Sequence, residues 1–263
     1  MSVRDSIIAF AQSIGLEKVG FARAEGGGTK IVALFPYYVP NEDGNLSMYA
    51  RGRDYHQVAE EKLKKICGFL EQFTKVPCKI FVDKGTQDDR AAAYQAGLGF
   101  YGRNGMLICE EYGSYFFIGH IYTDLELPAD KPLRKTCMEC GACEQACVGG
   151  ALRSRTFDIA RCVSDISQRK GELSTEEEKL LIQSGLCWGC DVCQTVCPHN
   201  RDLPVTALPE FLEHRICNLR LEDLEDISNR EFLRRYADYA FQWRGKQPIE
   251  RNLLLLGEKH AQK

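Results

Sequence analysis

Long apolar segments are missing from this 263-residue chain. No apolar run approaches the ~20 residues that a membrane-spanning helix requires. Net charge is also small, at -3, so the composition provides no bulk electrostatic attraction to nucleic acid or to an anionic membrane. We find no low-complexity segment. These absences argue against a membrane-spanning protein, and the composition is that of an ordinary globular chain.

A secretory leader is not expected either. The first residues carry charge at Arg4 and Asp5, and their apolar residues recur at helical spacing. We therefore predict a cytoplasmic protein, in which thiols stay reduced and serve as metal ligands rather than forming disulfides. This prediction matters because the chain contains 13 cysteines.

Apolar patterns divide the chain near residue 130. Before this point, helices are expected over 3–14, 54–74 and 88–96, and strands over 18–23, 30–38, 79–83, 105–109 and 114–123. The strand at 79–83 is expected to be buried. Beyond residue 130 lie most of the cysteines, a charged helix that opens at Ser174, and helices over 219–263. The pattern predicts a layered α/β or α+β first segment. The expected domains are 1–130, 131–205 and 206–263.

Eight cysteines form two copies of the spacing C-x-x-C-x-x-C-x-x-x-C. The first run is Cys137, Cys140, Cys143 and Cys147, and the second is Cys187, Cys190, Cys193 and Cys197. Bacterial two-cluster ferredoxins have this spacing, and the fourth cysteine of each run binds the other cluster. Two zinc sites are the weaker alternative, because they more often use separate C-x-x-C pairs. The spacing therefore predicts two 4Fe-4S clusters.

Cys162, between the runs, gives nine candidates for eight ligand positions. Spacing alone favours Cys187 over Cys162. Val148 also follows the first run, where Pro198 follows the second. The remaining cysteines lie in apolar or helical contexts and are expected to be small buried hydrophobic residues: Cys67, Cys78, Cys109 and Cys217.

An ordered set of motifs resembles the epoxyqueuosine reductase family. The motifs include ARGRDYH (50–56), VDKG (82–85), AGLGF (96–100), EYGSY (111–115) and ISNREF (227–232). The resemblance implies a cobalamin-dependent enzyme with two 4Fe-4S clusters that reduces epoxyqueuosine to queuosine in tRNA. It also implies an external one-electron donor such as flavodoxin or ferredoxin. The implied fold is α+β: a nitroreductase-like α/β cobalamin-binding domain, a two-cluster ferredoxin-like domain, and a short helical C-terminal segment.

The resemblance also assigns roles to single residues. Asp83 matches the family's proton donor, and the alternative is a carboxylate that caps the next helix, as Asp88 could do. Cobalamin contacts are implied at Ser47, Asp83, Leu107, Ile118, Ser164 and Asp191. The family uses the Arg-Cys position between the runs as a ligand and has an apolar residue at the position of Cys187. One cluster is then held by Cys137, Cys140, Cys143 and Cys197, and the other by Cys147, Cys162, Cys190 and Cys193.

Other residues have two interpretations. Gly97, Gly99 and Gly102 suit a chain that passes close to a flat macrocycle, or they are ordinary turn glycines. Arg51, Arg53 and His56 are candidates for phosphate or corrin contacts, or they belong to a solvated helix start. A basic group around the linker is a candidate tRNA patch or a solvated face: Arg153, Arg155, Arg161, Arg169 and Lys170.

Two features depart from the family pattern. Only five residues stand between Ala24 and Lys30, where the family has a longer insertion. The chain also ends within the first of the HEAT-like units that help to hold tRNA in the family, so the C-terminal segment is expected to be a truncated unit of this kind. The alternatives are a related cobalamin-dependent reductase of a small substrate, similar to reductive dehalogenases, and a non-catalytic iron–sulfur electron carrier.

Overall fold

The computed structural model describes residues 2–40, 43–83 and 88–261, which form two compact units. Unit 1 comprises Met1–Tyr38, Tyr55–Glu139 and Arg201–Pro209, and unit 2 comprises Val39–Asp54, Cys140–Asn200 and Glu210–Lys263. The three consecutive segments expected from the sequence do not coincide with these units, because each unit combines separate parts of the chain. The reason is a shared apolar core, which joins residues near Leu46, near Trp188 and in the C-terminal helices.

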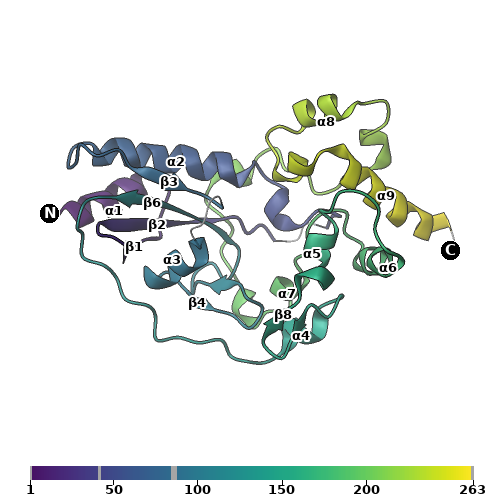
Figure 1. Cartoon of the computed structure of the whole chain (residues 1–263), viewed down its shortest axis with the longest axis horizontal. Helices are drawn as coiled ribbons and strands as arrows, with labels where there is room; N and C mark the ends of the chain where they lie inside the picture. The colour runs from purple at the N-terminus through teal and green to yellow at the C-terminus, as the bar shows by residue number, and fades with distance from the viewer. Residues whose placement is uncertain (1, 41–42, 84–87, 262–263) are drawn as a thin grey trace. The chain divides into compact units, whose positions relative to one another are not determined.

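Unit 1 is built on a four-stranded antiparallel sheet with helices on both faces (Figure 1). The strand order is β1-β2-β6-β3, with bounds Val19–Arg23, Thr29–Pro36, Phe116–Thr123 and Lys79–Phe81. β2 and β6 pair from Thr29 with Thr123 to Pro36 with Phe116. The strand expected at 79–83 is present, but the prediction that it is buried is wrong. It is a three-residue edge strand on which Lys79 is exposed.

Side-chain alternation gives the sheet two apolar faces. On one face, Val32 and Leu34 of β2 pack with Ala92 and Ala93 of α3 (Asp89–Gln95). The other face meets α2 (Tyr55–Leu70), on which α1 (Val3–Ser13) packs. Gly119 of β6 allows this close approach, because a Cβ there would lie 2.8 Å from Leu63 Cδ1.

Short elements complete unit 1. β4 (Phe100–Tyr101) pairs with β5 (Leu107–Ile108), so the strand expected over 105–109 is only two residues long. α3 begins where sequence rules predict, because the side chain of its N-cap Asp88 accepts a hydrogen bond from the Ala91 amide at 3.1 Å.

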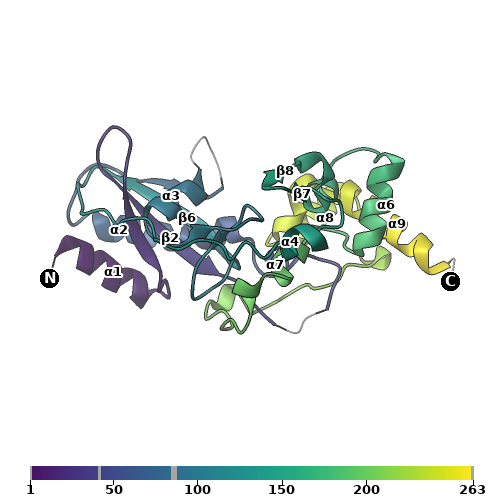
Figure 2. The ribbon, with the colours of Figure 1, turned by 90° about the horizontal axis from the view of Figure 1, so that it is seen from below.

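Unit 2 consists of helices, most of them short, and one small hairpin (Figure 2). Its α-helices are α4 (Ala142–Ala146), α5 (Val163–Ile166), α6 (Thr175–Ser184), α7 (Val192–Thr195), α8 (Asn229–Arg235) and α9 (Lys246–Ala261). The hairpin strands are β7 (Leu152–Arg153) and β8 (Thr156–Phe157). Short 3-10 turns lie at Met48–Ala50, Ile159–Arg161, Pro198–Asn200, Pro209–Phe211, Leu221–Asp223 and Ala240–Arg244. Within the described part of the chain, none of the helices is long and apolar enough to cross a membrane.

The core of unit 2 explains why the C-terminal helices join the cysteine segment. Leu46, Trp188, Leu219 and Phe241 are all buried in one apolar cluster. The fully buried Asn252 of α9 satisfies backbone groups inside it, since its Nδ2 donates to the carbonyls of Ser167 at 2.8 Å and Cys187 at 2.7 Å. Backbone groups near the cysteine runs are therefore held by the last helix.

Candidate functional site

The two cysteine runs have the same local backbone shape. The third residue of each run has a left-handed conformation, with φ of 56° at Glu139 and 73° at Gly189. A short helix follows in each, α4 in the first run and α7 in the second. α4 packs against α7 within unit 2 (Figure 2). The sequence repeat is therefore also a structural repeat.

Four thiols lie close enough to influence one another electrostatically: Cys147, Cys162, Cys190 and Cys193. Burial raises the pKa of the Cys190 thiol to about 11, and the neighbouring Cys162 and Cys147 act in the same direction. Burial also raises the pKa of Cys162 and of Cys193. Because iron binds thiolates, a cluster held by these residues would displace their protons and would place positive charge among the sulfurs.

This group of thiols has the number and type of ligands that a four-iron cluster takes. A four-iron cluster is a cube with a thiolate at each iron. Four soft thiolate ligands match that requirement.

Cys187 stands apart from this group. Its side chain is fully buried in the apolar core with Leu46 and Trp188, and its amide donates to the Asn45 carbonyl at 2.8 Å. Burial raises its pKa to about 12, and no other described cysteine contributes to that shift. By environment, Cys187 is a small hydrophobic residue, although it occupies the first position of a ferredoxin-like run.

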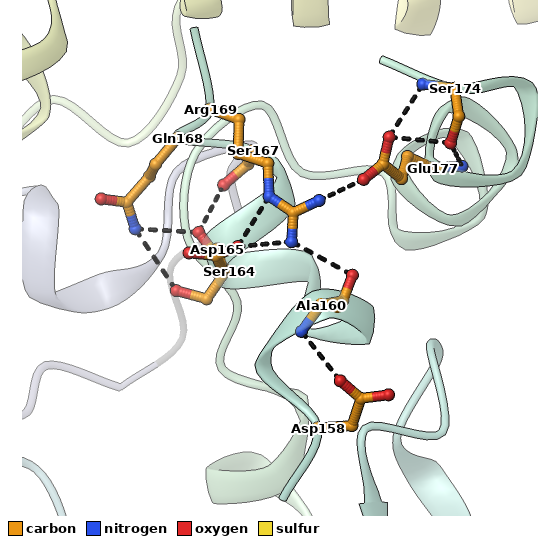
Figure 3. A network of polar contacts seen from close by, with 9 residues as sticks. All are labelled: Asp158, Ala160, Ser164, Asp165, Ser167, Gln168, Arg169, Ser174 and Glu177. Atoms are coloured by element: carbon orange, nitrogen blue, oxygen red, sulfur yellow. Dashed lines mark hydrogen bonds and ion pairs between the residues drawn. The ribbon is translucent and has the colours of Figure 1, made fainter.

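A polar network holds the linker that carries Cys162 (Figure 3). Arg169 Nε donates to Asp165 Oδ2 at 2.7 Å, its Nη2 donates to the Ala160 carbonyl at 3.1 Å, and its Nη1 pairs with Glu177. Ser174 and Glu177 form a capping box at the start of α6. Arg169 therefore stabilises unit 2 internally, so its side chain does more than form a solvated face.

Gly149 lets the chain after Cys147 approach the residue before Cys162. Arg161 Nε donates to the Gly149 carbonyl at 2.6 Å, and a Cβ on Gly149 would overlap the carbonyl oxygen of Arg161. This contact holds the segment after Cys147 against the segment before Cys162, and both cysteines belong to the group of four thiols.

We predict that Gly149→Ala destabilises the protein by about 1–3 kcal/mol through overpacking and lowers its iron content after anaerobic reconstitution. Thermal unfolding and iron analysis check this. Gly68→Ala is the matched control, because Gly68 lies in α2 and a Cβ there meets nothing within 4 Å. Equal iron content and equal melting temperature in the two variants would contradict the role given to Gly149.

Asp83 presents its carboxyl group to solvent just beyond β3. Its side chain is 69% exposed, the Tyr55 hydroxyl donates to Oδ2 at 2.6 Å, and His56 Nε2 lies 3.8 Å from the same oxygen. Its φ of 50° is left-handed, which costs a non-glycine residue roughly 1–2 kcal/mol. Asp88, not Asp83, caps α3, so the capping alternative for Asp83 is wrong. Lys84 and Gly85 of the motif lie outside the described residues.

Tyr55 is a site residue that sequence reasoning missed. It stacks on Phe117 with ring centroids 4.2 Å apart, and this orients its hydroxyl toward Asp83. Its position directly before His56, at the expected start of a helix, is the feature of the sequence that could have indicated this role. His56 contacts Asp83 rather than belonging only to a solvated helix end.

Two residues that the family resemblance places beside cobalamin, Ser47 and Asp191, form a hydrogen bond with each other. Ser47 is fully buried and its Oγ donates to Asp191 Oδ1 at 2.6 Å, while the Met48 amide donates to Oδ2 at 2.6 Å. Burial raises the pKa of Asp191, against the lowering effect of these two hydrogen bonds. These hydrogen bonds hold residues 46–48 against the second cysteine run. The Asp191 carboxylate accepts one of them at each oxygen.

The other implied contacts fit a cofactor bound through packing and a few polar groups. Leu107 is 2% exposed, Ile118 is half-buried beside the α3 face of the sheet, and Ser164 is half-buried on α5. In unit 1 the Asp83 carboxyl group and Ile118 keep accessible atoms, and in unit 2 Ser164 does. The chemistry of these groups suits a corrin bound mainly by packing, whereas the side chains of Ser47 and Asp191 bond to each other.

The candidate glycines are explained by the protein's own packing. A Cβ would lie 2.7 Å from the Lys131 carbonyl oxygen at Gly97, 2.7 Å from that of Ile108 at Gly99, and 2.6 Å from Asn104 Oδ1 at Gly102.

The buried Arg51 also contacts the protein itself, since its Nε donates to the Leu46 carbonyl at 2.8 Å. Arg51 is thus a structural residue of unit 2 and not part of a solvated helix start.

The remaining cysteines differ in burial. Cys109 is buried, as expected, and burial raises its pKa to about 11. Cys67 and Cys78 are half-buried and hydrogen-bond to each other, and Cys217 is half-buried. For these three residues, the expected burial is only partial.

Comparisons with known proteins agree with the cysteine pattern. Residues 136–200 match the family described as 4Fe-4S double cluster binding domain, and residues 24–84 match Epoxyqueuosine reductase QueG, DUF1730. A curated epoxyqueuosine reductase of Bacillus cereus is 30% identical over 304 residues, which cover 96% of this chain and 79% of the relative.

Solved structures of similar proteins share the fold. An epoxyqueuosine reductase solved with an epoxyqueuosine-modified tRNA stem loop has a TM-score of 0.86 at 29% identity, covering 97% of this chain and 80% of that one. The Bacillus subtilis enzyme, solved with an aspartate's catalytic loop swung out of the active site, has a TM-score of 0.84 at 28% identity, with the same coverage. A catabolic reductive dehalogenase shares the fold alone, with a TM-score of 0.52 at 16% identity over 98% of this chain and 36% of that one.

Proposed function

This chain belongs to the epoxyqueuosine reductase family, and from that premise we propose that it reduces epoxyqueuosine to queuosine in tRNA. The observation that carries the proposal is the carboxyl group of Asp83, which is exposed and held by the hydroxyl of Tyr55. A proton donor must reach a reacting oxygen, and a carboxyl group held at a fixed position outside a core meets that requirement.

We propose the following division of labour. The nitroreductase-like domain that binds cobalamin lies mainly in residues 1–130, although Val39–Asp54 belong to unit 2. Residues 131–205 supply the ferredoxin-like domain, and residues 206–263 supply a helical segment that resembles a HEAT-like unit. The thiols of Cys147, Cys162, Cys190 and Cys193 hold one 4Fe-4S cluster, a proposal supported by their mutual electrostatic influence. Cys137, Cys140, Cys143 and Cys197 hold the other.

The reaction removes the epoxide oxygen as water, which consumes two electrons and two protons and leaves an alkene. When bound, the clusters supply single electrons and cobalamin supplies a strongly nucleophilic cobalt centre. The chain's own residues supply binding, orientation and protons. Asp83 donates a proton to the departing oxygen, and Tyr55 and His56 keep its carboxyl group in place.

The proposed partners follow from the same chemistry. The substrate is tRNA carrying epoxyqueuosine, since a relative was solved with such a stem loop. The electrons come from an external one-electron carrier such as flavodoxin or ferredoxin. We place the enzyme in the cytoplasm, because thiolate ligands require a reducing compartment.

Two measurements on the anaerobically reconstituted protein test this function. Titration with cobalamin, followed by absorption, is expected to show binding. Addition of a strong one-electron donor and epoxyqueuosine-containing tRNA is then expected to produce queuosine. A protein that carries clusters but binds no cobalamin would be an electron carrier. A protein that binds cobalamin, reduces an aryl halide and leaves the tRNA unchanged would be a dehalogenase-like reductase.

A further inference from the structure

A second carboxylate holds the backbone of Asp83. Asp89, the first residue of α3, accepts a hydrogen bond from the Asp83 amide at its Oδ2, with a distance of 2.7 Å. The Asp83 carboxyl group is held separately by Tyr55 and His56 from α2. The left-handed backbone at Asp83 is therefore restrained at its amide and at its side chain, by residues of two different helices.

A histidine in the sheet lies against the other oxygen of Asp89. His120 Nδ1 is 2.9 Å from Asp89 Oδ1, and the two atoms are in polar contact without an aligned hydrogen bond. His120 is fully buried on the interior strand β6, where it pairs with Phe81 of β3 and stacks on its ring at 4.9 Å. Asp83 follows that same β3 by two residues.

These contacts form a continuous connection from the sheet to the proposed proton donor. The order is His120 on β6, Asp89 on α3, and the amide of Asp83. His120 Nε2 has no hydrogen-bond partner among the described residues, so the contact of Nδ1 with Asp89 is the polar contact that the described structure gives this buried ring.

We propose that Asp89 and His120 are positioning residues that set the place of the Asp83 carboxyl group for proton transfer. The proposal rests on the proposed function and deepens it, since it identifies residues that act through the proton donor without touching substrate. Asp89 fixes the Asp83 amide, and His120 fixes the carboxylate of Asp89 against a rigid strand. Small displacements of a catalytic group are costly, and about 1 Å can lower a rate by roughly 100-fold.

Asp88 provides a matched control. It is adjacent to Asp89, has the same side chain and caps the same helix through the Ala91 amide, but it makes no hydrogen bond to Asp83 in the described structure. A role of Asp89 in helix stability alone would make Asp88→Ala and Asp89→Ala similar. If Asp89 positions Asp83, then only Asp89→Ala lowers kcat.

The test is a double-mutant cycle with Asp83→Asn. We expect Asp89→Ala to lower kcat by about tenfold and to leave KM for the tRNA within about twofold, because substrate binding is untouched. In the Asp83→Asn background, Asp89→Ala is expected to cause no further loss. Asp88→Ala is expected to lower the melting temperature and to keep kcat within about twofold of wild type.

His120→Phe keeps the aromatic stack on Phe81 and removes the contact with Asp89. We expect a loss of kcat like that of Asp89→Ala, again absent in the Asp83→Asn background. Losses that multiply in that background would show that Asp89 and His120 act independently of Asp83 and would overturn the proposal. So would wild-type kcat in Asp89→Ala.

A second readout does not require turnover. Hydrogen exchange at the Asp83 amide, measured in the cluster-loaded protein without cobalamin, is expected to be faster in Asp89→Ala than in wild type and unchanged in Asp88→Ala. Equal exchange rates in wild type and Asp89→Ala would show that Asp89 does not restrain the Asp83 amide, and this would overturn the proposal whether or not the protein is active. An inactive wild-type protein that shows the expected exchange pattern would instead count against the proposed function.

Discussion

Replacing Cys162 by alanine is expected to remove one of the two clusters. Iron per chain should fall from about eight to about four, and half of the cluster absorption should be lost. The reason is the position of Cys162 beside Cys147, Cys190 and Cys193, where its thiol is one of four that influence each other. Iron analysis and electron paramagnetic resonance of the reduced, reconstituted protein measure this loss.

Cys187→Ala is the matched control for that experiment. The Cys187 side chain is enclosed by apolar residues, so alanine leaves only a small cavity, whereas serine would bury a hydroxyl group in that core. Both clusters should remain, and stability should fall slightly. Loss of a cluster in Cys187→Ala, with full iron in Cys162→Ala, would show that the ferredoxin spacing gives the true ligands.

Asp83→Asn is expected to have the second large effect, a fall in kcat of roughly 100- to 10,000-fold, which is the usual contribution of a general acid. Asparagine keeps the size of the side chain and tolerates the left-handed backbone, but it has no acidic proton to donate. Single-turnover analysis of the tRNA nucleosides measures the rate.

Binding provides the control for this variant. Cobalamin affinity, tRNA affinity and iron content should match those of wild type, because the carboxyl group acts on the reacting oxygen. If Asp83→Asn turns over at the wild-type rate, then another group supplies the proton. If it loses cobalamin, then Asp83 serves mainly in cofactor binding.

Local sequence patterns predicted much of the fold, because each pattern has a direct physical cause. The apolar stripes of α1 and α2 and the strands β1, β2 and β6 occur close to the expected positions. The strand at 79–83 was expected to be buried because its residues are apolar, yet an edge position leaves Lys79 exposed. Such a position depends on strand order, which local periodicity does not contain.

The candidate site was predictable where chemistry is carried by residue type. The cysteine runs indicated iron–sulfur clusters by spacing alone, and the choice of Cys162 over Cys187 came from the family resemblance. The bonds of Tyr55 and Asp89 to Asp83 were not predictable, because they join residues that only the packing of helices on the sheet brings together. The same is true of Ser47 with Asp191, where a residue expected to contact cofactor is used to hold the protein's own backbone.

The proposed reaction can be measured in cells through the nucleoside composition of tRNA, in a bacterial strain that lacks its own epoxyqueuosine reductase and expresses this chain. With cobalamin supplied, we expect queuosine to appear and epoxyqueuosine to disappear, and we expect Asp83→Asn to fail to produce this change. Epoxyqueuosine that persists in cells containing the folded, cluster-loaded, cobalamin-bound protein would show that the chain does not catalyse this reaction.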